Sequence, residues 1–194
     1  PFISEFFNIL GRICHDANPE MKEKIAELII WIFDEYINLL TNKESLLDQF
    51  KSSTSNLIVG ISLNTTHQRN KIRKLSIIAL TKLLSINNKA FSNIHGSYRN
   101  CSIDNNAEVR LTTFECLSSL LRNFNITNLK KYEGIIIKYF ITGLSDEKNN
   151  IKSYCYNEIE TLGEYRKKLE DSIENNSNNT GMDVEKDDEN DDEL

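Results

Sequence analysis

Apolar side chains recur every three or four residues along most of the chain, most clearly in residues 104–121, DNNAEVRLTTFECLSSLL. There they follow the i, i+3, i+4, i+7 spacing of one helical face. No run alternates with a sustained period of two, and the 194 residues include only two prolines and seven glycines. The pattern therefore predicts an all-α protein. The apolar positions that define it are Val109, Thr113, Cys116, Leu117, Leu120, Leu121 and Phe124.

The same pattern occurs three times. HQRNKIRKLSIIALTKLL, from residue 67, and DEKNNIKSYCYNEIETLG, from residue 146, carry an aliphatic-basic pair at the same offset. The steps between copies are 109 − 72 = 37 and 151 − 109 = 42 residues, near the period of roughly 40–47 residues in HEAT and armadillo repeats. We therefore expect stacked antiparallel helix pairs. The three pairs are Ile72-Arg73, Val109-Arg110 and Ile151-Lys152.

A further copy is one of two interpretations of the segment that begins at Asp16. Met21, Lys22, Ile25 and Ile29 lie at the matching offsets, but the step to the next copy, 72 − 21 = 51 residues, is longer than the others. The expected solenoid has about four helix pairs if this copy is real. The expected helices are 3–14, 19–40, 43–63, 69–85, 89–98, 106–123, 129–144 and 149–168. Residues 87–103 hold Gly96 and few aliphatics, so part of that segment is expected to be loop.

Charge divides the chain into two parts. The net charge is −6, whereas residues 170–194 contain eleven acidic residues and one lysine, a net of −10, so residues 1–169 carry +4. The final segment has almost no apolar side chains to offset the entropy of ordering. We therefore expect a HEAT-repeat solenoid over residues 1–169 and a disordered acidic tail over 170–194. Because the chain begins with Pro1, we expect it to be the C-terminal part of a longer array.

Composition argues against membrane insertion and disulfides. The most apolar window, IAELIIWIFDEYINLL, contains three acidic residues, so it is predicted to be a core helix with Asn18 as cap and Pro19 at its start. The four cysteines show no metal-ligand spacing, which favours free thiols in a reducing compartment. The terminal DDEL is similar to a retrieval signal of the endoplasmic reticulum, but no signal peptide accompanies it. The cysteines are Cys14, Cys101, Cys116 and Cys155.

No catalytic constellation is present, and we expect neither an enzyme nor a cofactor. The chain lacks phosphate-binding, dinucleotide-binding and zinc-protease motifs, and its three histidines are dispersed. Cys14 and His15 are neighbours, but adjacent helical residues point about 100° apart and do not form a nucleophile and base. Asp104 and Asp146 each precede a helix, where capping is the commoner role. An enzyme of unrecognised type remains the alternative.

The basic positions of the repeat have two possible roles. Arg73, Arg110 and Lys152 recur at repeat spacing and would be able to follow a phosphate backbone. One basic residue per repeat is a sparse footprint, and the denser RNKIRK cluster at residues 69–74 is local. Pairing with an acidic residue of a neighbouring repeat is the better interpretation, and nucleic acid is not an expected partner.

The string of an aspartate, four residues, Val-Arg, a small residue and a leucine resembles the second helix of the HEAT repeat. In that family the Asp and Arg positions form a ladder between repeats, which implies structural roles for the matching residues. Three departures are His67 at the first acidic position, Lys152 where Arg is usual, and Glu158 where the other copies have Ala79 and Cys116. By resemblance, these departures loosen the third repeat most. The matching residues are Asp104, Asp146, Arg73, Arg110 and Lys152.

Residues 64–171 further resemble the HEAT-repeat dynein axonemal assembly factor, through HQRNKIRKLSIIALTKLL, GLSDE and ETLGEYRKKLED. The resemblance implies a cytoplasmic scaffold for the preassembly of axonemal dynein arms. It also implies dynein heavy or intermediate chains, other assembly factors and chaperones as partners. The alternative is a general HEAT adaptor, such as a transport receptor, a phosphatase scaffold or a chromosome scaffold.

Superposing the copies also predicts a face for partners. Seven polar residues of the second helices fall at positions that point away from the core, and solenoids present such repeated faces to partners. They are Lys74, Lys82, Glu115, Arg122, Asn157, Glu160 and Glu164.

Overall fold

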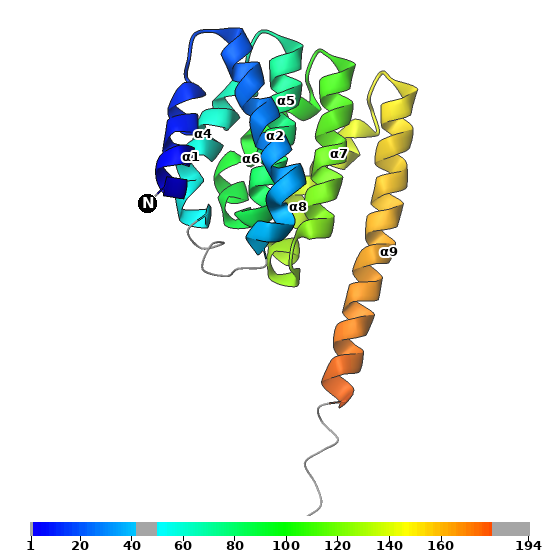
Figure 1. Ribbon diagram of the computed structural model, residues 1–194. Helices are drawn as coiled ribbons and strands as arrows, with labels where there is room; N and C mark the ends of the chain where they lie inside the picture. The colour runs from blue at the N-terminus through cyan, green and yellow to red at the C-terminus, as the bar shows by residue number, and fades with distance from the viewer. Residues whose placement is uncertain (1, 42–49, 180–194) are drawn as a thin grey trace, which may run out of the picture.

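The computed structural model describes residues 2–41 and 50–179 (Figure 1). These residues form α-helices, with one 3-10 turn, η1, at Asn88–Ala90, and contain no strand, which confirms the all-α prediction. No helix within them is long and apolar enough to cross a membrane. The helices are α1 (Phe2–Ile13), α2 (Pro19–Thr41), α4 (Ser55–Asn64), α5 (Asn70–Ile86), α6 (Phe91–Ser102), α7 (Ala107–Asn123), α8 (Ile126–Gly143) and α9 (Asn149–Asn179).

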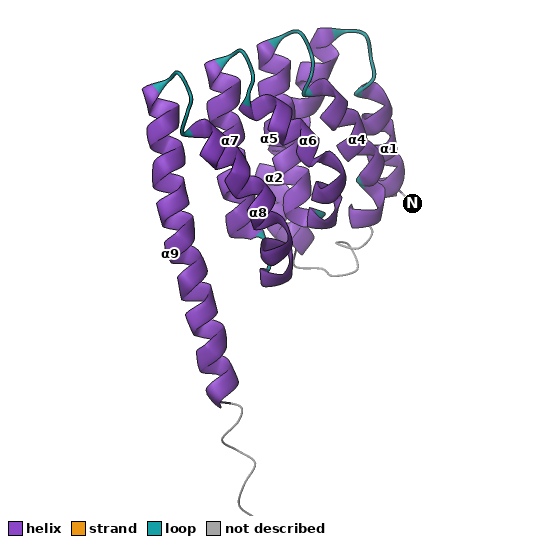
Figure 2. Ribbon diagram, turned by 180° about the vertical axis from the view of Figure 1, so that it is seen from behind, coloured by secondary structure: helices purple, strands orange, loops and turns teal. Residues whose placement is uncertain are grey.

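The helices stack in two layers, as an α-solenoid requires. α1, α4, α6 and α8 follow one another in the first layer, which Figure 2 shows from its own side, and α2, α5, α7 and α9 form the second layer. Each first-layer helix also packs against the second-layer helix that follows it. α2 packs beside α5 in the same way as α5 packs beside α7. The segment that begins at Asp16 therefore contains the second helix of a further repeat, α2.

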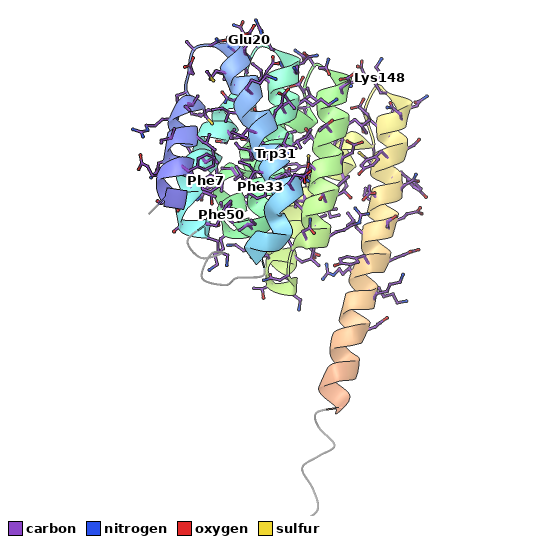
Figure 3. All side chains as sticks on the ribbon, in the orientation of Figure 1. Phe7, Glu20, Trp31, Phe33, Phe50 and Lys148 are labelled. Atoms are coloured by element: carbon purple, nitrogen blue, oxygen red, sulfur yellow. The ribbon has the colours of Figure 1, made fainter. Side chains whose placement is uncertain are left out.

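One hydrophobic core runs through the stack. In the first pair, Phe7 and Phe33 both contact Phe50, with ring centroids 4.5 and 5.7 Å apart (Figure 3). The small position that follows the basic residue of each repeat is fully buried at Ser76, Thr113 and Cys155. A small side chain there allows neighbouring helices to approach closely, and aliphatic side chains fill the surrounding layer. The large and small positions seen in the sequence therefore correspond to packing layers.

The segment expected to be partly loop is helical through Ser102, because aromatic rings replace the missing aliphatics. Phe91 and Tyr98 of α6 are fully buried, and the Phe91 ring lies 5.1 Å from Tyr132 of α8. The Tyr98 hydroxyl hydrogen-bonds that of Thr81 on α5 at 2.8 Å. Gly96 lies in the middle of this helix, where a side chain would meet open space. The expected loop was therefore wrong.

Two helix boundaries also differ from the prediction. The helix expected over 43–63 is interrupted, because residues 50–53 are helical and the chain bends at Thr54 before α4 begins. Residues 43–49 lie outside the described residues. α9 continues to Asn179, past the expected end at 168, so the predicted boundary at 169 falls within this helix. Residues 180–194 of the predicted tail also lie outside the described part of the chain.

Gly143, the last residue of α8, marks the closest approach between α8, α7 and α9. A methyl group at this position would come within 2.7 Å of Cζ of Phe114 and would overlap Sγ of Cys155. Both partners are fully buried, so neither has free space to move into. The absence of a side chain at Gly143 therefore sets how tightly the last helix pair packs.

We expect Gly143→Ala to lower the free energy of unfolding by about 1–3 kcal/mol, because overpacking forces neighbouring side chains out of position. Gly96→Ala is the matched control, since open space surrounds its Cβ position and alanine favours a helix by up to about 1 kcal/mol over glycine. Urea unfolding followed by circular dichroism measures both variants. Equal stabilities for the two would contradict the close approach at Gly143.

Candidate protein-binding surfaces

Buried ion pairs join neighbouring repeats at the loop end of the stack. The Arg73 guanidinium donates Nε to Oδ2 of Asp104 at 2.6 Å and Nη2 to Oδ1 at 2.7 Å. One repeat further on, Arg110 makes the same two bonds to Asp146 at 2.7 and 2.9 Å. Bidentate pairs of this kind are geometrically specific. They hold each second helix against the loop of the following repeat.

Each arginine also stabilises the loop of its own repeat. Nη1 of Arg73 donates to the carbonyl oxygens of His67 and Gln68, and Nη1 of Arg110 donates to those of Asp104 and Asn105. The hydrogen bonds from Arg110 lower the pKa of Asp146, which therefore stays ionised. These charges are neutralised within the fold, so they do not form a basic path for nucleic acid.

The two aspartates brace the loops and do not cap the helices. Asp104 accepts the backbone N–H of Asn106, and Asp146 accepts that of Lys148, both at 2.8 Å. The cap of α7 is Asn106, whose side chain accepts the N–H groups of Glu108 and Val109. Capping by Asp104 was therefore the wrong expectation.

The first position of this ladder has a histidine in place of the aspartate. Nδ1 of His67 accepts the backbone N–H of Arg69, two residues later, at 3.1 Å. Asp104 and Asp146 each accept the N–H two residues later in the same way. Burial, and then the positive charges of Lys22, Arg69 and Arg73, lower the pKa of His67. A neutral imidazole cannot pair with the cation of the preceding repeat, and Lys22 donates instead to Oδ1 of Asn64 at 2.8 Å.

Other contacts take over at this first junction. Nζ of Lys22 also donates to the carbonyl oxygen of Cys14 at 2.9 Å. Glu23 of α2 lies 2.6 Å from Nζ of Lys71 on α5, which reverses the polarity of the inter-repeat pair. At the opposite end, Lys152 forms no ion pair within the described residues. The described ladder therefore has two complete pairs.

The predicted partner face is exposed, but its cations are engaged. None of its seven residues is buried: Lys74 and Lys82 are half-exposed and the other five are exposed. Lys74 pairs with Glu108 at 3.4 Å and Lys82 with Asp34 at 2.5 Å, each across neighbouring second helices. Arg122 pairs with Glu158 at 2.8 Å. The other four residues form no ion pair within the described part of the chain and keep this face as a candidate for partners. They are Glu115, Asn157, Glu160 and Glu164.

Glu158, a departure from the repeat pattern, joins α9 to α7. Its Oε2 accepts from Nη2 of Arg122 at 2.8 Å and also from the Ser118 hydroxyl. The Glu158 side chain is only 16% exposed. Glu158 therefore has partners on α7, although α9 packs against α7 less extensively than α7 packs against α5, so the expected loosening of the third repeat stays a prediction.

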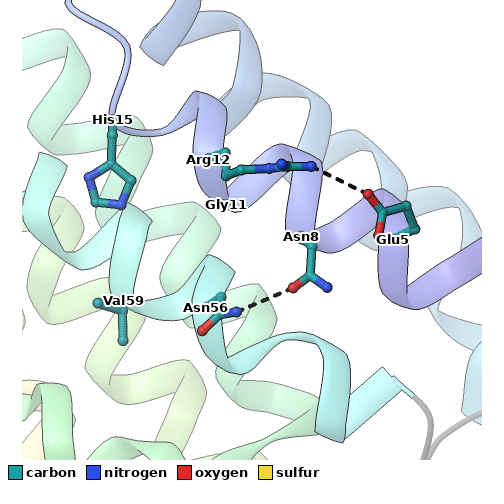
Figure 4. A pocket seen from close by; sticks show the side chains of 7 residues that line it. All are labelled: Glu5, Asn8, Gly11, Arg12, His15, Asn56 and Val59. Atoms are coloured by element: carbon teal, nitrogen blue, oxygen red, sulfur yellow. Dashed lines mark hydrogen bonds and ion pairs between the residues drawn. The ribbon is translucent and has the colours of Figure 1, made fainter.

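The hollow between α1 and α4 offers little to a ligand (Figure 4). Its polar side chains pair with one another: Arg12 with Glu5 at 3.3 Å, and Asn56 with Asn8 at 3.3 Å. His15 lies at its edge and is exposed, whereas the neighbouring Cys14 is buried. The two side chains thus lie in different environments, as expected for residues that do not form a dyad.

All four cysteines are buried and free. Burial raises the pKa of Cys14 and Cys116 to about 11, and that of Cys101 and Cys155 to about 12. A thiol that stays protonated is a poor nucleophile and a poor metal ligand. Among the described residues, no group of three potential metal ligands occurs. These side chains act as small hydrophobes in the core.

A second hollow, of about 550 Å³, lies between α8 and α9 at the end of the stack. We call it the α8–α9 groove. An ion pair between Glu133 of α8 and Arg166 of α9 links its two walls. The groove was not predicted from the sequence, although the glycines within the helical patterns of α8 and α9 were a signal for it. Its apolar and glycine lining consists of Leu121, Leu129, Gly134, Ile137, Ile141, Ile159, Leu162 and Gly163, with Tyr165 beside them.

We expect Arg110→Ala to destabilise the chain by about 3 kcal/mol or more, because it leaves the buried carboxylate of Asp146 without its counter-charge. Arg122→Ala removes a partly exposed pair and should cost no more than about 1 kcal/mol. Denaturant unfolding of both variants measures the difference. Equal losses in the free energy of unfolding would show that the buried pair stabilises the chain no more than the partly exposed pair does.

We expect His67→Asp to stabilise the chain by up to about 1 kcal/mol, since a carboxylate keeps the loop bond and adds attraction to Lys22. The lowered pKa means that the folded chain favours neutral His67. Its contribution is therefore complete above the unfolded value near 6.5 and lost as pH falls through the lower folded value. Thermal unfolding from pH 8 to 5 should show a smaller acid-induced loss in the variant than in the parent chain. His15→Asp, at an exposed site, is the control.

A known protein family matches this chain. The family model for dynein axonemal assembly factor 5-like TPR repeats matches residues 1–176, which span the helical stack and most of α9. No curated protein and no solved structure gives a match. The step of 42 residues lies within the HEAT period of roughly 40–47, and the step of 37 lies midway between that period and the 34 of a TPR unit. With this match over most of its length, the chain belongs to the dynein axonemal assembly factor 5-like repeat family.

Proposed function

We propose that this chain is a non-catalytic scaffold that binds proteins while axonemal dynein arms are preassembled in the cytoplasm. The observation that carries the proposal is the family match over residues 1–176. Its expected partners are dynein heavy or intermediate chains, other assembly factors and chaperones. The described side chains support binding over catalysis, because the buried thiols are protonated and the buried charges are paired.

The mechanism follows from the geometry of a solenoid. Each repeat contacts mainly its neighbours, so the stack offers an extended surface with many modest contacts in place of one deep pocket. Affinity then depends on the sum of these contacts and on how rigidly the repeats hold them. The ladder contributes rigidity, while the exposed polar residues of α7 and α9 contribute contacts. Single surface substitutions should therefore have small effects.

Disruption of the gene in a flagellated cell should remove or thin the dynein arms, which electron microscopy of axoneme cross-sections measures. Re-expression with Ser153→Ala, an exposed substitution outside the predicted partner face, should restore them. Re-expression with Leu117→Asp should not, because it places an unpaired charge at a fully buried position and costs several kcal/mol. Normal arm numbers and normal beating in the disrupted cell would end this proposal and favour a general adaptor.

A further inference from the structure

The α8–α9 groove corresponds to a surface that is covered in the inner repeats. Within the stack, α8 packs against both helices of the preceding pair, α6 and α7. On α7, three leucines are covered by the neighbouring helices and are at most 1% exposed. They are Leu117, Leu120 and Leu121. The corresponding positions of α9, 42 residues later, are Ile159, Leu162 and Gly163. The described chain places no helix over them.

The walls of the groove are open and apolar. A Cβ atom added at Gly134 or Gly163 would meet no atom of a neighbouring element within 4 Å. Ile141 of α8 is 54% exposed, although it shares the groove with buried leucines. The lining of α8 extends from Leu129 to Ile141, or about 18 Å at 1.5 Å per residue. A helix of about three turns matches this length.

Positive charge surrounds the groove. Lys138 lines it, Lys130 precedes Gly134 by one helical turn on the same face of α8, and Lys167 follows Gly163 by one turn on α9. All three are exposed, and within the described part of the chain none forms an ion pair. Glu133, the acidic residue in the lining, is already paired with Arg166. Glu160, one turn before Gly163 on α9, accepts a hydrogen bond from the Tyr156 hydroxyl. Three unpaired lysines therefore outnumber this carboxylate around the apolar floor.

We propose that the α8–α9 groove binds an amphipathic helix of a partner protein, with an apolar stripe flanked by acidic residues. Such a helix would stack on α8 and α9 as α8 stacks on α6 and α7. A second copy of the chain does not fit, because its groove would bring lysines against lysines. Residues 180–194 do not fit either, since Met182, Val184 and Leu194 are their only apolar side chains.

This inference deepens the proposed function by giving the chemistry of one partner segment, and it rests on that function only for the identity of the partner. The recognition mode is an amphipathic helix laid into an apolar groove, in which side chains at i, i+3, i+4 and i+7 supply the contacts. The lysines select the charge of the flanks and accelerate encounter. Their contribution is screened by salt over a Debye length of about 8 Å at physiological ionic strength.

The test uses the full chain and three labelled synthetic peptides of 16 residues, with fluorescence anisotropy as the readout. The first has leucines on one helical face and glutamates on its flanks, the second replaces the glutamates with lysines, and the third scrambles the leucine positions. We expect the first to bind at least tenfold more tightly than the other two, with affinity that falls as salt rises. Equal binding of the first two would overturn the proposed charge selection.

Variants then locate the binding site. Gly163→Leu and Gly134→Leu project apolar side chains from positions where an added Cβ meets open space, so both should keep normal thermal unfolding and lose at least tenfold in affinity. Gly96→Leu, at an equally open position of α6, is the matched control and should bind as the parent does. Lys138→Glu combined with Lys167→Glu should weaken the acidic peptide and strengthen the basic one. Unchanged binding by Gly163→Leu and Gly134→Leu would overturn the groove as the site.

The two proposals fail separately. If peptide binding maps to the groove but axonemes are normal after gene disruption, the groove is supported as a helix-binding site and the proposed role in dynein assembly is overturned. Lost dynein arms without selective peptide binding would overturn the groove and leave the assembly role in place. A rescue of the disrupted cell with Gly163→Leu and with Gly96→Leu connects them: if both proposals hold, only the second variant restores the arms.

Discussion

The buried guanidinium–carboxylate pair between neighbouring repeats is the interaction on which the geometry of this stack depends. Apolar contacts between α5 and α7 hold the helices together, but they have little directional preference and would tolerate a sliding of one helix along the next. The two parallel hydrogen bonds from Arg110 to Asp146 tolerate no such shift. Desolvating both charges is costly, and the additional bonds to loop carbonyls and backbone N–H groups offset that cost.

The junctions along the stack are therefore unequal. Two of them have complete bidentate pairs, whereas the junction between α2 and α5 uses a neutral histidine, an amide and the reversed pair of Glu23 with Lys71. There Nζ of Lys71 lies 2.6 Å from Glu23 and 3.7 Å from Glu27, and the Lys71 side chain is largely exposed to solvent. In a molecule where each repeat contacts mainly its neighbours, local stability follows the local interface. The junction between α2 and α5 thus relies on apolar packing and partly exposed charges, whereas buried pairs fix the orientation at the two junctions that follow.

Much of the fold was predictable because helix periodicity and repeat spacing are local properties of the sequence. The helical structure of α6 was not predictable in this way, because its buried side chains include the aromatic Phe91 and Tyr98 and few aliphatics. Glu158 looked like a defect because Arg122, its partner, lies 36 residues away and is adjacent only in the stack. The α8–α9 groove escaped notice for a similar reason. Whether Gly163 faces solvent or another helix depends on how many repeats follow, which local periodicity does not encode.

The last described helix, α9, is the longest in the stack. At 31 residues it is about 46 Å long, while α7 beside it has 17 residues and is about 26 Å long. The α9 helix is therefore roughly 20 Å longer than α7, and in Figure 1 its C-terminal turns extend past the end of α7. These turns have no described helix beside them, so their backbone hydrogen bonds are open to water. Their helical structure depends on local propensity, whereas the first turns of α9 are held by tertiary packing.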